Sequence, residues 1–580
     1  MSRNGSIDWL CLPRFDSGAC FAALLGTPEH GRWLLAPASK PRAIRRCYRE
    51  GTLVLETEYE TDEGVVAVID CMPPRSGAPD LVRVVEGRRG AVPMRMELIV
   101  RFDYGSIVPW VTKCPDGLSA IGGPDRLWLR TPAQLESHDL KTRSNFIVNE
   151  HDVVPFVLTW TPSYISVPPE VTDGVKALAA TESWWRAWSE RCQYRGEWSD
   201  AVLRSLITLK AMTYAPTGGI VAAVTTSLPE QIGGVRNWDY RICWLRDATF
   251  TLYALMVAGY REEALAWRDW LLRAVAGSPA QFNTMYGLAG ERRLVELEIP
   301  WLPGYEDSRP VRIGNAAYAQ HQLDVYGEVL DVMHQCRIMK LAEDDLDSWS
   351  LERTLLQSLE SDWKKPDEGI WEVRGPARHF THSKVMAWVA CDRAVKAVER
   401  FGREGPVERY RALRDQIHAE VCDKGFDAEL GAFVQSYGSR FLDASLLMMP
   451  LVGFLPAADP RMRSTIEAIE RKLVRDGFVM RYETEPAVDG LPVGEGTFLI
   501  CSFWLVDCLV FLGRREDARR LFERLLSIRN DLGLLAEQYD PTAKRLLGNF
   551  PQAFSHVALV NAAYNLGKPI ERDSEEAPST

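Results

Sequence analysis

Residues Thr52-Leu-Val-Leu-Glu-Thr-Glu-Tyr-Glu60 and Ala177-Leu-Ala-Ala-Thr-Glu-Ser-Trp-Trp-Arg-Ala-Trp188 follow different periods, and this difference decides the fold. Apolar and polar residues alternate in the first stretch and in Val65-Val-Ala-Val-Ile-Asp70, which predicts antiparallel strands between turns. Similar runs recur throughout residues 1–170 with few helical stretches between them, and this favours a sandwich over a parallel sheet. Residues 1–170 are therefore predicted to form a β-sandwich.

A helical period begins at about Val171. Residues 171–198 are predicted to form a linker helix, residues 199–570 a helical domain, and residues 571–580 a disordered tail. The connections 228–244 and 300–314 are long and mix aromatic with charged residues, which suggests a site built at the ends of helices in a helical toroid. The predicted helices cover residues 201–214, 248–258, 261–276, 315–336, 381–401, 406–423, 461–476, 497–512 and 515–526.

The bulk composition limits the classes of function. A chain of 580 residues exceeds the range of one hydrophobic core, so at least two domains are expected. The chain has 79 acidic and 68 basic residues and a net charge of -11, without a long basic run, which disfavours a nucleic-acid partner. The apolar stretches fall short of the roughly 20 residues of a membrane-spanning helix, and the N-terminus lacks the pattern of a signal peptide.

The twelve cysteines are scattered along the chain, without a Cys-x-x-Cys pair or a Cys/His cluster at metal-ligand spacing. This pattern argues against a metal site and against a disulfide framework, and it fits a reducing cytoplasm. We expect no cofactor. The sequence leaves open whether the chain forms a homo-oligomer.

The densest group of candidate functional residues is Arg236-Asn-Trp-Asp-Tyr-Arg-Ile-Cys-Trp-Leu-Arg-Asp247, with three aromatic residues, three arginines and two aspartates. Sugars stack on aromatic rings, and charged groups hold their hydroxyls, so Trp244, Arg246 and Asp247 could bind a carbohydrate. The alternative is structural: Asp247 caps a helix that begins at Ala248 and pairs with Arg246, while the tryptophans are packing. Composition alone leaves both interpretations open.

Two further segments each contain a candidate catalytic carboxylate. Glu372 lies beside a tryptophan in Asp367-Glu-Gly-Ile-Trp-Glu-Val-Arg-Gly375, interpreted as a strand-like segment, and desolvation against an indole favours the protonated form of a carboxylate. Glu537 lies in Gly533-Leu-Leu-Ala-Glu-Gln-Tyr-Asp-Pro541, interpreted as a loop after a helix. Glycoside hydrolysis normally needs two carboxylates, although either residue could also be an ordinary surface glutamate.

These segments, together with Gly548-Asn-Phe-Pro-Gln-Ala-Phe-Ser-His556, resemble the glucoamylase/trehalase family of inverting glycoside hydrolases. The resemblance runs from about Gly5 to Asn565, and Gly5-Ser-Ile-Asp-Trp-Leu-Cys-Leu-Pro-Arg-Phe-Asp16 looks like the opening of the N-terminal β-sandwich in bacterial members. It implies a β-sandwich followed by an (α/α)6 barrel.

The same resemblance implies roles for single residues. Glu372 matches the family's general acid and Glu537 its general base. The segment around Trp244 resembles the group that holds the non-reducing glucose. The residues implied to bind sugar are Trp238, Trp244, Arg246, Asp247, Trp371 and Arg481, with Arg309 and Arg312 as weaker candidates; Glu495 is implied either to contact the second glucose or to form a buried ion pair.

The sequence also departs from the family pattern. Bacterial members usually have some twenty further residues before the equivalent of Gly5, so we expect the first strand of the sandwich to be missing. Val373 stands where fungal glucoamylases have a second glutamate, which weakens the expectation of starch-like recognition beyond the first subsite.

The substrate is the most open point. The segments Thr225-Thr-Ser-Leu-Pro-Glu230, Met285-Tyr-Gly-Leu-Ala-Gly-Glu-Arg292 and His379-Phe-Thr-His-Ser-Lys384 look most similar to actinobacterial trehalases, so trehalose is the leading expected substrate. Hydrolysis of α-1,4 or α-1,6 glucosides by a glucoamylase or glucodextranase is the alternative within the family. Outside it, the alternatives are a non-catalytic sugar-binding protein and a phosphorylase on the same barrel, and a carboxylate at Glu537 would repel the phosphate of the latter.

Overall fold

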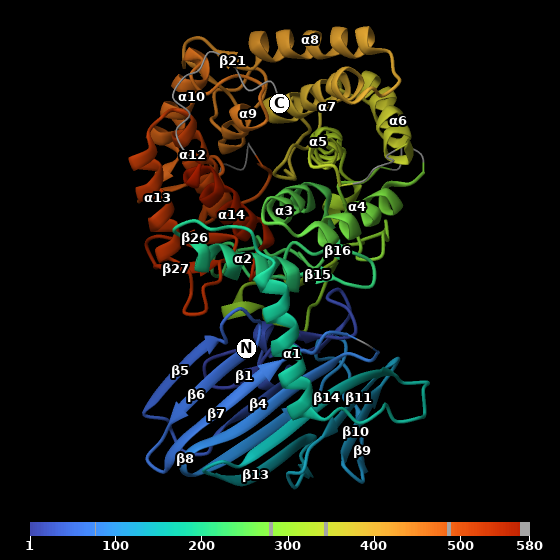
Figure 1. The fold of residues 1–580 in the computed structure, drawn as a ribbon, viewed down its shortest axis with the longest axis vertical. Helices are drawn as coiled ribbons and strands as arrows, with labels where there is room; N and C mark the ends of the chain where they lie inside the picture. The colour runs from blue at the N-terminus through green and yellow to red at the C-terminus, as the bar shows by residue number, and fades with distance from the viewer. Residues whose placement is uncertain (76, 278–281, 342–345, 484–488, 493, 569–580) are drawn as a thin grey trace.

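The computed structural model describes residues 1–568 except 76, 278–281, 342–345, 484–488 and 493. It has an N-terminal part made of strands and a C-terminal part made mainly of helices (Figure 1). The predicted β-sandwich followed by an (α/α)6 barrel is confirmed. The predicted tail, residues 571–580, lies outside the described residues.

One long strand, β8 (Asp80–Ile99), organises the sandwich. Its first half pairs with β7 (Gly64–Cys71) and β14 (Val153–Pro162), and its second half pairs with β4 (Arg32–Pro37) and β13 (Lys141–Asn149), all antiparallel. The strand therefore belongs to two sheets. Apolar residues from both halves and their neighbours, such as Val66, Val85, Met96 and Phe156, form one buried core between the sheets.

Further strands extend these two sheets. Beyond β7 come β6 and β5, beyond β14 come β11, β10 and β9, while β1 pairs with β4 and β12 with β13. The strands are β1 (Ser6–Ile7), β5 (Ala43–Tyr48), β6 (Leu55–Glu60), β9 (Trp110–Cys114), β10 (Gly117–Gly122), β11 (Asp125–Arg130) and β12 (Glu136–His138).

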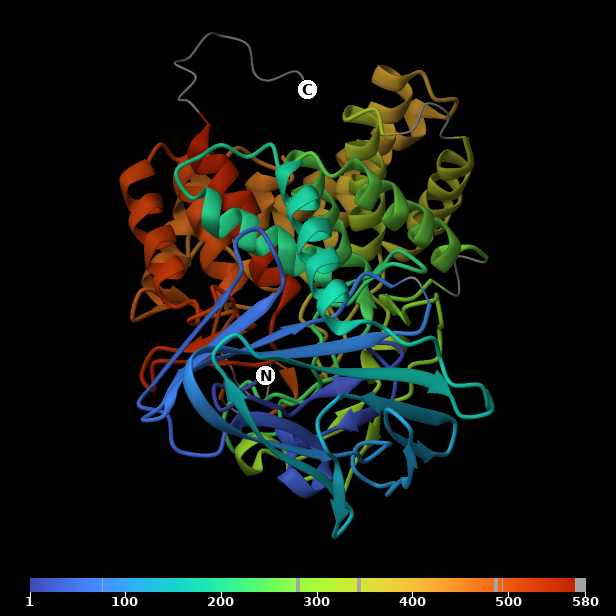
Figure 2. The same cartoon turned by 60° about the horizontal axis from the view of Figure 1, so that its bottom comes forward.

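Helix α1 (Gly174–Glu190) joins the two parts (Figure 2). Its N-cap is Asp173, whose carboxylate accepts hydrogen bonds from the next turn. Leu178 near its start packs on the outer face of the sandwich, whereas Trp188 near its end is stacked at 4.0 Å on Tyr260 of the helical part. The linker is therefore anchored at both ends.

The helical part consists of an inner and an outer ring of helices, seen in Figure 1. The inner helices are buried on nearly all sides; in α12 every residue from Leu499 to Leu509 is buried. The outer helices are amphipathic, and α13 buries only Ala518, Phe522 and Leu525. Inner are α3 (Leu245–Val257), α5 (Asp324–Ile338), α7 (Thr381–Phe401), η6 with α9 (Ala444–Leu447, Met448–Leu451), α12 (Leu499–Phe511) and α14 (Ala553–Gly567); outer are α2 (Ser199–Ala211), α4 (Arg261–Val275), α6 (Leu346–Asp362), α8 (Val407–Lys424), α10 (Pro460–Lys472) and α13 (Arg515–Ser527).

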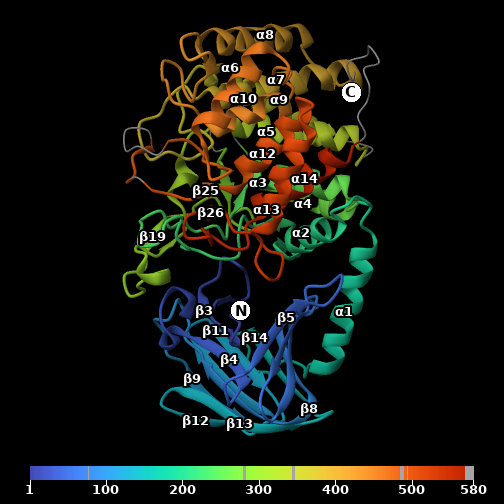
Figure 3. The same cartoon turned by 90° about the vertical axis from the view of Figure 1, so that its left-hand side faces the viewer.

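The connections between the rings differ in length at the two ends of the barrel. Inner helices lead to the next outer helix through short turns such as 258–260 and 512–514, whereas outer helices lead to the next inner helix through long loops such as 212–244 and 528–552. Three short strands of these loops, β19 (Leu297–Glu298), β25 (Thr497–Phe498) and β26 (Gln538–Asp540), lie toward one side of the helical part in Figure 3. The long loops thus gather at the N-terminal ends of the inner helices.

Several predicted helices need correction. The helix predicted over 315–336 begins only at Asp324, because Asn315 caps a short 3-10 turn and the Leu323 amide donates to Asp367 instead. Helix α3 begins at Leu245, before the predicted start at Ala248. Helices α6 and α14 were not among the predicted ones.

No helix in the part of the chain that the structure describes is long and apolar enough to cross a membrane.

Candidate active site

Glu372 lies in a tight turn between α6 and α7, and the prediction of a strand-like segment is therefore wrong. The backbone of Glu372 adopts the left-handed conformation at φ 57°, with its amide donating to the carbonyl of Gly369 at 3.1 Å. A bulky residue rarely adopts this conformation, and such strain is concentrated at functional sites. The turn presents the carboxylate toward the N-terminal end of α3.

Two residues of the 236–247 segment hold the Glu372 turn. The Trp244 indole donates to Glu372 Oε1 at 2.5 Å, and Arg246 Nη1 lies 3.8 Å from the same oxygen. Arg246 also donates to the carbonyl of Ile370 at 2.6 Å and to Asp247 Oδ1 at 2.9 Å. Position and charge of the Glu372 carboxylate are therefore both controlled from α3.

The suggestion that Asp247 caps the helix is wrong. The N-cap of α3 is Trp244, and no side chain caps the helix there. Asp247 lies in the first helical turn, is 5% exposed and pairs with Arg246. The structural ion pair of the alternative interpretation is present, but the carboxylate also lines a cavity, described below.

Glu537 lies immediately before β26 and is 2% exposed. Tyr240 donates its hydroxyl to Glu537 Oε1 at 2.7 Å, and the Leu499 amide donates to the Glu537 carbonyl at 3.1 Å. Gly548, at φ 77°, passes so close that an added Cβ would lie 2.6 Å from Glu537 Oε2. Glycine is therefore required there by both conformation and space.

The two carboxylates, far apart in the chain, line one cavity. We call it the inner compartment; it lies where the long loops meet the N-terminal ends of the inner helices. Its other walls come from aromatic residues and from the Arg246–Asp247 pair. The lining residues are Ala222, Tyr240, Trp244, Arg246, Asp247, Ile370, Trp371, Glu372, Arg481, Phe498, Glu537, Gln552 and Phe554.

A second cavity, the outer compartment, adjoins the first and shares Tyr240, Trp371, Glu372 and Arg481 with it. Glu537 lines only the inner compartment, whereas Glu372 lines both. The outer lining is richer in ion pairs and comprises Glu230, Arg236, Trp238, Tyr240, Asn315, Trp371, Glu372, Val373, Arg374, Arg481, Tyr482, Asp489 and Leu491.

A buried ionic network forms part of the outer wall. Arg481 pairs with Glu230 at 3.0 Å and with Glu495, while Arg236 donates to Asp489 Oδ2 at 2.6 Å. Such buried charges are stable only when they are paired and hydrogen-bonded. Each partner is therefore fixed, and the polar atoms that line the compartment have defined positions.

The predicted sugar-binding residues fall into three groups. Trp244, Arg246, Asp247, Trp371 and Arg481 line the inner compartment, and Trp238 lines the outer one. The others do not line either compartment. Glu495 is paired with Arg481, Arg312 donates to the carbonyls of Val235 and Asn237, and Arg309 is exposed.

Trp238 has little free ring surface. The guanidinium carbons of Arg312 and Arg374 lie 4.6 Å and 4.7 Å from its ring centroid, and its indole nitrogen donates to Glu230 at 3.0 Å. This geometry indicates that Trp238 fixes Glu230 and does not offer a free ring face to a sugar.

Sequence reasoning missed Tyr240, Gln552 and Phe554. All three lie within segments that carry the family resemblance, so a signal for them was present. The sequence does not reveal where each side chain points. The Tyr240 hydroxyl donates to Glu537, whereas the side chains of its neighbours Asp239 and Arg241 pair with each other.

Burial changes the acidity of both catalytic candidates. Desolvation raises the pKa of Glu372, against the lowering effects of Arg246 and the Trp244 indole. Desolvation and the charge of Glu230 raise the pKa of Glu537 well above its ordinary value, against Arg481 and the Tyr240 hydroxyl. A raised pKa suits a proton donor directly, and it predicts that a base at Glu537 becomes ionised only at a pH above the range usual for a glutamate.

A much larger cavity lies elsewhere. It occupies about 1320 Å³ between the inner helices and is lined by residues such as Tyr253, Met448 and Val510, but by neither Glu372 nor Glu537. We identify the candidate site by its paired carboxylates rather than by volume, because the carboxylates carry the chemistry.

Comparison with known proteins gives consistent matches. A family model described as "Glycosyl hydrolases family 15" matches residues 196–564, and one described as "Trehalase-like, N-terminal" matches residues 1–161. The chain is 39% identical to a trehalase of Mycobacterium tuberculosis, with 100% of this chain and 88% of the relative aligned. It is 33% identical to a trehalase of Thermoplasma acidophilum, with 98% and 97% aligned.

Solved structures show the same fold. A bacterial glucoamylase complexed with acarbose superposes with a TM-score of 0.72 at 12% identity, covering 97% of this chain and 91% of that one. A wild-type glycosidase superposes with a TM-score of 0.51 at 18% identity, covering 63% of this chain and 96% of that one.

Proposed function

The chain belongs to glycosyl hydrolases family 15, and from this premise we propose that it hydrolyses α,α-trehalose to two glucose molecules with inversion at the attacked carbon. Glu372 is the general acid and Glu537 the general base. The inner compartment holds the glucose that is attacked, and the outer compartment holds the glucose that leaves.

One observation carries the assignment: Glu372 lines both compartments, whereas Glu537 lines only the inner one. A general acid must reach the oxygen between the two sugars, and therefore it belongs at the junction of their pockets. A general base must reach a water at the far side of the attacked ring. The positions of the two carboxylates fit this division.

The proposed reaction is a single displacement. Glu372 gives its proton to the glycosidic oxygen as the bond from the anomeric carbon to that oxygen breaks. Glu537 takes a proton from a water whose oxygen forms the new bond to that carbon from the opposite face. The attacked glucose leaves with β configuration, the other glucose keeps its α configuration, and both carboxyl groups return to their starting protonation states when protons exchange with solvent.

The remaining inner residues bind and orient the substrate. Asp247 and Arg246 offer a charged pair for hydroxyls of the attacked glucose, and Trp371, whose indole donates to Asp443 at 2.9 Å, is fixed as an aromatic wall. Carboxylates near the ring also stabilise the positive charge that develops at the anomeric carbon. No metal or cofactor takes part in the proposal.

Trehalose is the proposed substrate because whole-length relatives are named trehalases. The outer compartment supports the choice, since it adjoins the inner one at Glu372 and its walls include fixed ion pairs. We infer a reducing compartment such as the cytoplasm as the place of action, because no disulfide joins the cysteines of the described residues.

The test is glucose release from trehalose, maltose, isomaltose and maltotetraose by the purified chain, with Glu372→Gln as the matched inactive control. Fast release from trehalose alone is the expected result. Preference for maltose or maltotetraose would make it a glucoamylase, preference for isomaltose a glucodextranase, and release that depends on added phosphate a phosphorylase. Binding of trehalose without any release would identify a sugar-binding protein.

A further inference from the structure

Arg241 connects the catalytic loop to the β-sandwich. Its guanidinium is 1% exposed and pairs in bidentate fashion with Asp239, at 2.9 Å and 2.7 Å. The remaining donors point into the sandwich: Nη2 donates to the hydroxyl of Tyr104 at 2.9 Å, and Nη1 donates to the carbonyl of Ser17 at 3.0 Å. The guanidinium carbon also lies 5.7 Å from the ring centroid of Trp9.

Tyr240 lies between these two fixed residues. Asp239 is held further by the Gly314 amide, which donates to Oδ2 at 3.0 Å. The side chains of Asp239 and Arg241 pair with each other, whereas the Tyr240 hydroxyl reaches Glu537 at 2.7 Å. Fixing the residues on both sides of Tyr240 sets the position of its hydroxyl, and with it the orientation of the Glu537 carboxylate.

The sandwich presents Tyr104 in a strained conformation. Asp103 and Tyr104 both have left-handed backbones, at φ 47° and φ 57°. The Tyr104 amide donates to the carbonyl of Ala19 at 3.0 Å, and Trp301 of the helical part donates its indole N–H to the Tyr104 carbonyl at 3.0 Å. Surrounding contacts must over-determine such a conformation, which is typical of functional sites.

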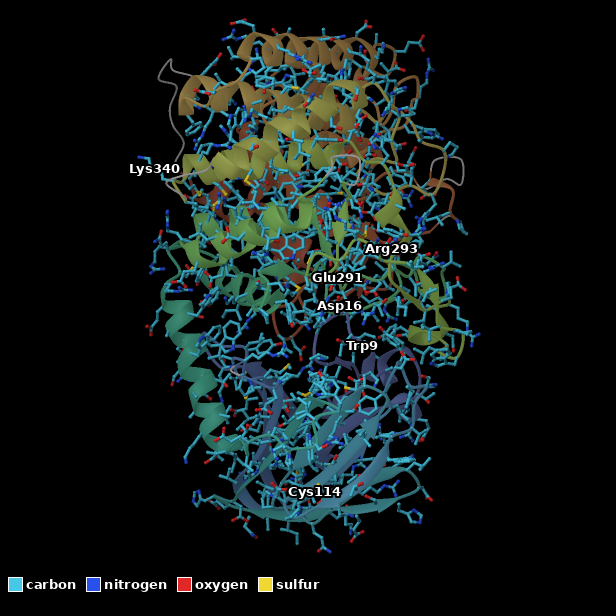
Figure 4. The ribbon with its side chains drawn as sticks, turned by 90° about the vertical axis from the view of Figure 1, so that its right-hand side faces the viewer. Trp9, Asp16, Cys114, Glu291, Arg293 and Lys340 are labelled. Carbon is cyan, nitrogen blue, oxygen red and sulfur yellow. The ribbon has the colours of Figure 1, made fainter. Side chains whose placement is uncertain are left out.

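The neighbouring contacts lie at the same junction. Figure 4 labels Trp9 and Asp16 of the sandwich at its boundary with the helical part, where Glu291 is labelled next to Asp16. Trp9 donates its indole N–H to the carbonyl of Val224 at 3.0 Å, and Arg14 pairs with Glu291 at 2.8 Å. The Arg14–Glu291 pair joins the same two parts without touching Asp239, Tyr240 or Arg241, so it offers a matched control.

We propose that the β-sandwich is a working part of the active site: Tyr104 holds Arg241, and Arg241 with Asp239 positions Tyr240 against the general base Glu537. Tyr104 and Arg241 are positioning residues, which touch neither the substrate nor the reacting atoms. The inference rests on the proposed function in one respect, the role of Glu537 as base.

The test compares Tyr104→Phe, Tyr240→Phe and their double variant with the full-length chain, using trehalose as substrate. Tyr104→Phe should lower kcat about tenfold and leave KM within about twofold, because small displacements of a catalytic group cost rate rather than binding. Because the Tyr240 hydroxyl lowers the pKa of Glu537, the acidic limb of the pH profile should also shift to higher pH. The double variant should match Tyr240→Phe alone, since both substitutions remove one pathway.

The control is Glu291→Gln, which breaks the neighbouring contact between the same two parts and should keep kcat and the pH profile of the parent chain. Should Tyr104→Phe fail to fold, Trp301→Phe removes another tether of Tyr104 and should give a smaller shift in the same direction. The inference would be overturned if kcat and the pH profile were unchanged in Tyr104→Phe or, in its place, Trp301→Phe. It would also be overturned if Glu291→Gln lost as much kcat as these variants. Glu537→Gln separates the two proposals. If the Glu537→Gln variant keeps its activity, the proposed function fails. If Glu537→Gln is inactive while Tyr104→Phe has the kcat and pH profile of the parent chain, only the positioning role of Tyr104 and Arg241 fails.

Discussion

The inner and outer compartments share four residues but differ in what their remaining walls can do. The inner compartment has both candidate catalytic carboxylates and the Arg246–Asp247 pair. The outer compartment has Glu372 alone of the two, and four of its other charged residues form the buried pairs Arg481–Glu230 and Arg236–Asp489. The difference teaches that bond cleavage is organised on one side of Glu372 and recognition of the leaving sugar on the other.

The largest effect is expected from a substitution of the proposed general base, Glu537. Glu537→Gln should lower kcat on trehalose by about 10³-fold, because an amide cannot take the proton of the attacking water. The same loss should occur with α-D-glucosyl fluoride, which also needs that water. The measurement is initial-rate kinetics on both substrates; a variant that keeps either activity would contradict the assignment of the base.

The acid should behave differently on the two substrates. Glu372→Gln should lower kcat on trehalose by about 10²- to 10⁴-fold, the usual range for loss of a general acid. On α-D-glucosyl fluoride it should retain most of its activity, since fluoride leaves without being protonated. Parallel losses on both substrates would mean that Glu372 does not act at the bond between the compartments.

Asp247 tests the binding side of the inner compartment. Asp247→Asn should lower kcat/KM about 10²-fold on both substrates, because it weakens hydrogen bonds to the attacked glucose that both contain. Circular dichroism melting serves as the control, since Asp247 also pairs with Arg246. A loss confined to trehalose would move Asp247's role to the leaving sugar.

The outer compartment should respond mainly in binding. Trp238→Phe removes the hydrogen bond from the indole to Glu230 and should raise KM for trehalose about threefold, with kcat nearly unchanged. The fluoride has no second sugar, so its KM should not change. If KM for both substrates rose equally, the division between the compartments would not hold.

The pH profile sharpens the comparison between the carboxylates. Activity requires ionised Glu537, so it falls as the pH drops through the pKa of that group; because this pKa is raised, the acidic limb should lie above the ordinary value of 4.5. Activity also requires protonated Glu372, whose pKa is raised too, so both limbs of the profile should lie above 4.5. An acidic limb at or below 4.5 in kcat/KM would contradict the described surroundings of Glu537.

The sequence was informative where a local period or motif determined structure. Alternation predicted the strands around Val65 and Leu55, and helical spacing predicted α7 and α12 closely. The prediction was wrong where tertiary contacts override propensity. Apolar spacing continues through Ala316 and Ala319, but the helix begins only at Asp324, because Asp367, distant in the chain, accepts a hydrogen bond from the Leu323 amide.

The candidate site was predictable in its carboxylates but not in its surroundings. Motifs singled out Glu372 and Glu537 as candidates. The sequence alone does not indicate that Glu537 accepts a hydrogen bond from Tyr240 or that the backbone of Glu372 is left-handed. Arg309 and Arg312 lie in a segment rich in charge and glycine, but the fold exposes the first and uses the second to hold backbone carbonyls. Their binding roles stay predictions.

Whether a single displacement occurs between Glu372 and Glu537 can be read from the anomers of the fresh products, by proton NMR during trehalose hydrolysis. A single displacement should give equal amounts of β-glucose and α-glucose in the first minutes, before mutarotation mixes them. Release of α-glucose alone would mean retention through a covalent intermediate and would contradict the assignment of Glu537 as a base that activates water.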